Sequence, residues 1–108
     1  MIVRQKKTLR RAVRIGSVSY LNAKPLVYGL DEADDVRLHL AVPSQLLDHM
    51  RRELYDVALL PVIDYQRMDG LCIIPAGGIG SDGPTLTVRV FSSCPIEQIR
   101  SLACDPEK

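Results

Sequence analysis

Cysteine, histidine and long apolar runs are all scarce in this chain of 108 residues. No apolar run approaches the roughly 20 residues that a membrane span needs, so we expect no membrane association. The three cysteines, Cys72, Cys94 and Cys104, include no C-x-x-C pair and leave an odd count, which favours a reduced, cytoplasmic setting over a disulfide framework. The two histidines, His39 and His49, have no potential metal ligand at a useful spacing, so we expect no metal site.

The composition is that of an ordinary globular protein, with 46% hydrophobic and 25% charged residues. These fractions exclude a disordered or collagen-like chain. A chain of 12.0 kDa buries about two-thirds of its unfolded surface, which is enough for one small domain with a modest core.

The near-neutral net charge of +1 conceals an asymmetry. Residues 1–14 carry six basic side chains and no acid, whereas the rest carries eight basic residues against 13 acidic ones. Such a basic segment can attract nucleic acid, lipid or an acidic partner, or it can be a solvated leader. No aromatic residue interleaves with the charges, so we expect no nucleic-acid partner, and Arg14 and Gly16 interrupt any secretory signal. We expect residues 1–12 to be a flexible leader and residues 13–108 to form the domain.

The first sixty residues alternate between strand-like and helix-like segments. Residues 36–42 alternate apolar and polar side chains, and residues 57–62 are almost continuously apolar, as in a strand buried on both faces. Apolar residues recur at helical spacing from Leu46 to Leu54. This order predicts an α/β fold with a mostly parallel sheet flanked by helices. The expected elements are a strand over 14–19, a helix over 23–30, a strand over 36–42, a helix from Pro43 and Ser44, and a strand over 57–62.

The later part of the chain continues the pattern with strands expected over 71–75 and 85–91 and a helix from Pro95. Between the two strands, Gly78 to Gly83 formally matches the dinucleotide motif G-x-G-x-x-G. We reject the match, because that motif must open onto a helix and here a proline and a strand follow.

Polar residues follow each of the first four predicted strands. Ligands of open parallel sheets bind at the carboxyl ends of the strands, where helix N-termini favour anions. The pattern therefore predicts half of a pocket for a small carboxylate. Helix capping explains Asn22 and Ser44 equally well, a plain turn explains residues 81–84, and Tyr20 is also typical of a core edge. The candidates are Ser19, Tyr20, Asn22 and Lys24, then Ser44, then Asp64 and Tyr65, and finally Ser81, Asp82 and Gly83.

Four segments in order, SYLNAKPL (19–26), VPS (42–44), DVALLP (56–61) and SDGP (81–84), resemble the N-terminal part of chorismate dehydratases of the futalosine route to menaquinone. The resemblance runs from about residue 13 to residue 105. It implies the first lobe of a fold like that of type II periplasmic binding proteins, with the ligand between two lobes. It also implies dehydration of chorismate to 3-[(1-carboxyvinyl)oxy]benzoate without a metal or organic cofactor.

The resemblance places Asn22 in the active site and assigns Ser44 and residues Ser81 to Gly83 to the substrate carboxylates. Members of the family continue past this point, so we expect the chain to be an incomplete fragment with little activity alone. A lobe of a solute-binding or sensing protein without chemistry is the alternative. The related naphthoate synthase step of the same route is a third interpretation.

Overall fold

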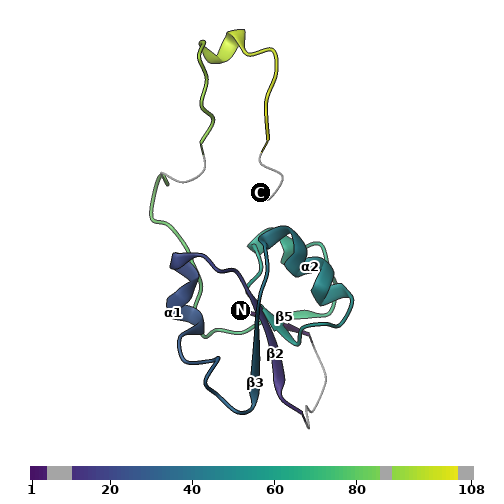
Figure 1. The fold of residues 1–108 in the computed structure, drawn as a ribbon. Helices are drawn as coiled ribbons and strands as arrows, with labels where there is room; N and C mark the ends of the chain where they lie inside the picture. Colours follow the sequence, from purple (N-terminus) through teal and green to yellow (C-terminus); the bar gives the residue numbers. More distant parts are fainter. Residues whose placement is uncertain (5–10, 86–88, 105–108) are drawn as a thin grey trace.

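The structure is a computed structural model that describes residues 1–4, 11–85 and 89–104 (Figure 1). Five strands form one sheet in the order β3-β2-β4-β1-β5. β2 runs parallel to β3 and β4, whereas β1 runs antiparallel to β4 and β5. The α/β fold is confirmed, but the sheet is mixed rather than mostly parallel. The strands are β1 (Ile2–Arg4), β2 (Val13–Ser17), β3 (Val36–Leu40), β4 (Val57–Ala58) and β5 (Leu71–Ile73).

Helix α2 (Pro43–Arg51) joins β3 to β4 and makes their parallel arrangement possible. Pro43 begins the helix at its first position, where a missing N–H costs nothing. The N-cap is the extended Val42, with no side-chain hydrogen bond, so Ser44 lies inside the first turn and does not cap it. The predicted apolar stripe is buried at Leu46, Leu47 and Met50, and it ends there because Leu54 lies beyond the helix and is exposed.

The helix expected over 23–30 is shorter and is capped differently. A 3-10 turn, η1 (Leu21–Ala23), leads into α1 (Lys24–Val27), and no side chain caps either element. Asn22 therefore lies within η1, and capping does not explain it. Past the end of α1, Gly29 has a φ of 75°, which favours glycine.

The expectation of a leader outside the fold is wrong for Ile2–Arg4. These residues form β1, which lies between β4 and β5, and Ile2 is only 5% exposed. The cause is burial, because Ile2 joins the core cluster and the backbone of β1 completes hydrogen bonding on both sides. Residues 5–10 lie outside the described residues.

The core lies between the sheet and α2. Tyr55 reaches it from the connection between α2 and β4, and its ring covers Gly16 so closely that a Cβ at Gly16 would overlap it. The hydroxyl of Tyr55 is 3.0 Å from Nδ1 of His49, and burial raises the pKa of Tyr55. The buried cluster consists of Ile2, Val18, Ala23, Leu46, Met50, Tyr55, Ala58 and Leu71.

The strand expected over 57–62 stops at Ala58, and α3 (Val62–Tyr65) follows Pro61. The strand expected over 71–75 ends at Ile73. Residues 86–88 of the strand expected over 85–91 lie outside the described residues, and the described residues of that range are in no strand. The helix expected from Pro95 is only the 3-10 turn η2 (Ile96–Gln98). None of the helices in the described ranges is long and apolar enough to cross a membrane.

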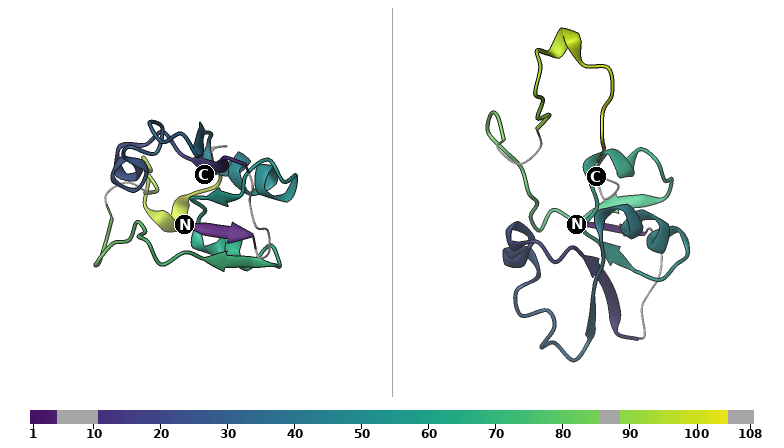
Figure 2. Two further views of the ribbon diagram at one scale, coloured as in Figure 1. Left: turned by 90° about the horizontal axis from the view of Figure 1, so that it is seen from below. Right: turned by 45° about the horizontal axis from the view of Figure 1, so that its top comes forward.

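Residues 89–104, which we call the arm, project away from the sheet and carry η2 at their tip (Figures 1 and 2). The molecule is accordingly elongated, with extents of 58 × 28 × 22 Å.

Candidate functional site

An open hollow of about 410 Å³ lies where β2 and β4 end. Because these strands are parallel, with Gly16 opposite Ala58, the segments that follow them emerge on the same side. The N–H of Leu59 donates to the carbonyl of Gly16 at 2.9 Å and holds the ends of the two strands together. Tyr20 and Asn22, in the segment that follows β2, line one side of the hollow.

The segment that follows β4 and the glycine-rich loop after β5 form the other sides of the hollow. Leu59 and Leu60 follow β4, and Tyr65 comes from α3. Gly77 and Gly78 close a third side, where the N–H of Ile74 donates to the carbonyl of Met1 at 2.7 Å. With Pro43 of α2, segments from five parts of the chain thus meet at this hollow.

The side chains that line the hollow are apolar or neutral, and Met1 also brings its terminal ammonium, which donates to the carbonyl of Gly77 at 3.4 Å. Asn22 is exposed and offers an amide that both donates and accepts, and Tyr20 and Tyr65 carry hydroxyls. No acidic, lysine, arginine or histidine side chain is among the residues that line the hollow in the described part of the chain. Such a lining suits a ring that is held by shape and by hydrogen bonds.

The other candidate residues lie elsewhere. Ser19 and Lys24 line a second hollow of about 310 Å³ beside Asp31 and Glu32. Ser44 lines a groove of about 800 Å³ between α2 and α3, together with Asp64. The structure therefore brings Tyr20, Asn22 and Tyr65 together and leaves these residues outside the hollow.

The SDGP segment forms a turn on the surface. The Ser81 hydroxyl donates to the carbonyl of Gly83 at 2.9 Å, and Gly83 has a φ of 98°. Ser81, Asp82 and Gly83 are exposed and do not line the hollow. This geometry is the plain turn that the sequence also allowed.

Sequence reasoning missed the apolar wall. Leu59, Leu60 and Val62 were assigned to a doubly buried strand, yet they line the hollow. Pro61 was the available signal, because a residue without an N–H rarely continues a central strand.

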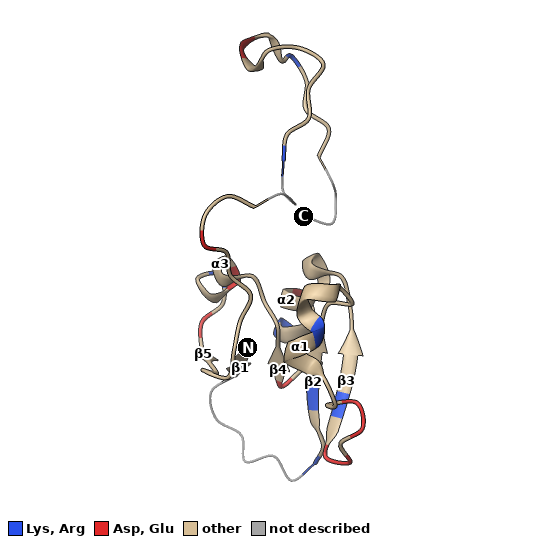
Figure 3. Cartoon of the chain, turned by 90° about the vertical axis from the view of Figure 1, so that its left-hand side faces the viewer, with Lys and Arg blue, Asp and Glu red and all other residues tan. Residues whose placement is uncertain are grey.

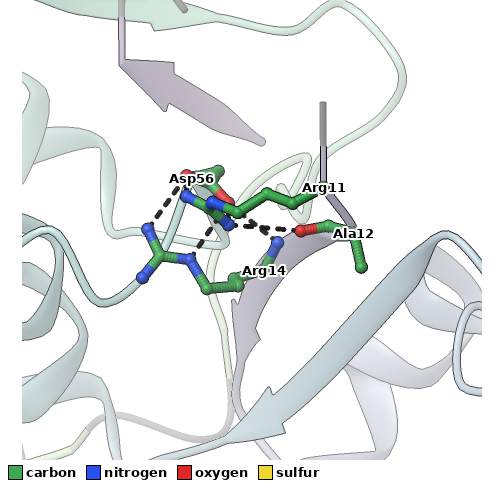
Figure 4. Close-up of polar contacts among 4 residues, drawn as sticks. All are labelled: Arg11, Ala12, Arg14 and Asp56. Carbon is green, nitrogen blue, oxygen red and sulfur yellow. Dashed lines mark hydrogen bonds and ion pairs between the residues drawn. The ribbon is translucent and has the colours of Figure 1, made fainter. Parts of the chain in front are cut away.

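A cluster of charges joins the starts of β2 and β4 (Figure 4). Asp56, just before β4, accepts two hydrogen bonds of 2.9 Å from the Arg11 guanidinium and bonds of 3.2 and 3.0 Å from that of Arg14. The backbone N–H of Arg14 donates a further bond of 2.9 Å. Burial alone would raise the pKa of Asp56, but the bonds from Arg14 and Arg11 outweigh it and hold that pKa well below its usual range.

No group of three potential metal ligands comes together within the described ranges. An α/β fold with an open hollow at the carboxyl ends of parallel strands, lined by apolar and uncharged side chains, is typical of small-molecule binding. A family model described as menaquinone biosynthesis matches residues 13–108. The chain belongs to this menaquinone biosynthesis family. No solved structure matches the chain. The matched residues include Tyr20, Asn22 and Tyr65, whereas β1 precedes them.

Proposed function

We propose that the chain is the N-terminal lobe of a chorismate dehydratase with a fold like that of type II periplasmic binding proteins, acting in the cytoplasm on the futalosine route. The observation that carries the proposal is the position of the SYLN segment, whose Tyr20 and Asn22 line the hollow at the end of β2. Membership of the menaquinone biosynthesis family supports it.

The proposed reaction is an elimination. A ring C–H bond and the adjacent C–OH bond of chorismate break, the hydroxyl leaves as water with the proton, and the ring becomes aromatic. Aromatisation supplies much of the driving force, so the protein mainly orients the ring and stabilises the developing negative charge. The Asn22 amide is the group we assign to that hydrogen bond.

The lining also bears on the proton acceptor. The side chains that line the hollow in the described ranges include no carboxylate, imidazole or amine. We propose that the ring proton passes to a carboxylate of the substrate itself, held beside the ring in the same hollow. Backbone N–H groups and the tyrosine hydroxyls are the donors that we expect to meet the substrate carboxylates.

The open mouth of the hollow limits the rate. Water reaches a ligand there and weakens every hydrogen bond and charge interaction on which the transition state depends. We therefore expect the 108-residue chain alone to bind chorismate weakly and to convert it only slowly.

Titration of the labelled chain with chorismate, followed by NMR, tests the site, and ultraviolet absorbance of the aromatic product tests the reaction. We expect the signals of Tyr20, Asn22 and Tyr65 to shift. Asn22→Ala should lower affinity and product formation together, whereas Gln45→Ala, on the exposed side of α2, should change neither. Unchanged binding and turnover in Asn22→Ala would refute the assigned role.

A lobe that binds or senses a small carboxylate without chemistry is the second candidate. The uncharged side chains of the lining favour it, because binding by shape and hydrogen bonds needs no acid or base. Binding of chorismate with no aromatic product, even after prolonged incubation at high protein concentration, would favour this candidate.

A further inference from the structure

β1 occupies the slot between β4 and β5, as Figure 3 shows. Ile2 and Val3 pair with β4 on one side, and all three residues of β1 pair with β5 on the other. Among the described residues β5 pairs with no other strand, and β4 and β5 do not pair with each other. β1 is therefore the strand that links β5 to the rest of the sheet. It precedes residues 13–108, so membership of the family assigns it no role.

One side of the hollow depends on the same link. Met1 and Ile2 line the hollow directly, and Ile73 lines it from the end of β5. The N–H of Ile74 donates to the carbonyl of Met1 at 2.7 Å, and residues 77–79 then continue the lining. On this side, the strand pairing that joins the lining residues to the sheet thus runs through β1.

Few contacts hold β1 in its place. It has three residues, and Ile2, which is 5% exposed, supplies its contact with the core cluster. Ordering each residue of a strand has an entropic cost, and elements with few buried contacts open more readily than the core does. A ligand that touches β1 only in its docked position therefore shifts the balance towards docking.

We propose that β1 is a strap, and that its docking between β4 and β5 and the binding of a ligand in the hollow favour each other. When β1 is docked, Met1, Ile2 and Ile73 together present an apolar side to the ring of the ligand. When β1 is released, that side loses Met1 and Ile2, and β5 loses its neighbouring strand. The coupling is reciprocal, so the ligand stabilises docked β1 by the factor by which docking raises affinity. The proposal rests on the proposed function, because it takes the hollow as the site of chorismate.

A disulfide between β1 and β5 tests the coupling. Val3 lies opposite Cys72 in an antiparallel pair, where Cα atoms are about 4.5–5.5 Å apart, and a disulfide spans such a separation. Val3→Cys should therefore form a crosslink with Cys72 on oxidation and fix β1 in the sheet. We expect the oxidised form to bind chorismate about twofold or more tightly than the reduced form, because β1 is then docked in every molecule. In the matched control, Val3→Cys combined with Cys72→Ser, oxidation should leave the affinity unchanged.

Val3→Pro tests the opposite direction, because Val3 does not line the hollow. Proline removes an N–H from a strand that is paired on both sides, so β1 should be released. We expect the affinity for chorismate to fall about fivefold or more. Val3→Ile keeps a β-branched side chain and should bind as the parent chain does. Should circular dichroism show Val3→Pro to be unfolded, the comparison of oxidised and reduced Val3→Cys decides alone.

Hydrogen exchange separates a failure of this proposal from a failure of the proposed function. The crosslink should slow exchange of the Ile74 N–H, which bonds to Met1, and chorismate should slow it in the parent chain. Unchanged exchange on crosslinking, or equal affinities of the oxidised and reduced forms for chorismate, would overturn the role of β1. Failure of both forms to bind chorismate would refute the proposed function and the coupling with it, whereas exchange at Ile74 tests the link between β1 and β5 without any ligand.

Discussion

Replacing Asp56 with asparagine tests how strongly the charge cluster holds the chain before β2 and β4. Asp56 is 11% exposed, and its partners Arg14 and Arg11 are 30% and 45% exposed. A hydrogen bond to a charged group contributes about 1.5–3 kcal/mol to stability, whereas an exposed ion pair contributes about 0–1 kcal/mol. Because the carboxylate is nearly buried, we expect Asp56→Asn to lower the free energy of unfolding at neutral pH by about 2 kcal/mol.

The same cluster sets a pH dependence with a definite sign. The pKa of Asp56 is lower in the folded chain than in the unfolded chain, where it lies near 3.9. Its contribution is therefore fully present above about pH 5 and is lost as the pH falls below the unfolded pKa towards the folded one. The difference between the parent chain and Asp56→Asn should narrow over that acidic range, because a protonated carboxyl resembles an amide.

Urea unfolding followed by circular dichroism, repeated from neutral to acidic pH, measures both effects. Asp48→Asn is the matched control, since Asp48 pairs with Arg52 at 2.9 Å but is 51% exposed. We expect the control to cost less than about 1 kcal/mol. Equal losses for the two variants, or a difference for Asp56→Asn that stays constant into acid, would refute the reasoning.

Two further substitutions test the packing of the sheet. Gly16→Ala should lower the free energy of unfolding by about 1–3 kcal/mol, because the new methyl group overlaps the ring of Tyr55. Gly80→Ala, with open space around the new methyl group, should leave the free energy of unfolding nearly unchanged. Similar urea midpoints for the two variants would contradict the close packing of Tyr55 on Gly16. Ile2→Asp should cost about 3 kcal/mol, because it places a charge in the core. If it costs no more than Ile96→Asp in the exposed arm, β1 does not stabilise the sheet.

The elements that the sequence predicted well are those with a local pattern. β2, β3 and α2 begin within a residue of their expected positions, because alternation and helical spacing record which face is buried. The sequence of β1 shows no such periodic pattern of apolar and polar residues. Its three residues stand among basic side chains, and their partners Val57 and Cys72 lie more than fifty residues away. Pairing across that distance depends on the whole fold and cannot be inferred from the segment.

The candidate site residues also fall into those whose position the sequence could predict and those whose position it could not. Tyr20 and Asn22 directly follow a strand that was predicted correctly, so their place at its carboxyl end could be inferred. Ser44 was also placed correctly after β3, but the first turn of α2 places it in the groove shared with α3. The position of the SDGP turn depends on the path of the glycine loop, which sequence periodicity does not specify.

The basic leader has a different meaning once β1 is considered together with the hollow. Charge alone predicts that residues 1–12 are a solvated leader, yet Met1 and Ile2 line the hollow beside Tyr20. The family match begins at residue 13, so part of the wall comes from outside the matched region. Asp56 binds Arg11 at the point where the chain returns from β1 to β2. The two ends of the leader are thus held by apolar burial at Ile2 and by the charge cluster at Arg11, and the buried end is the one that forms part of the wall of the hollow.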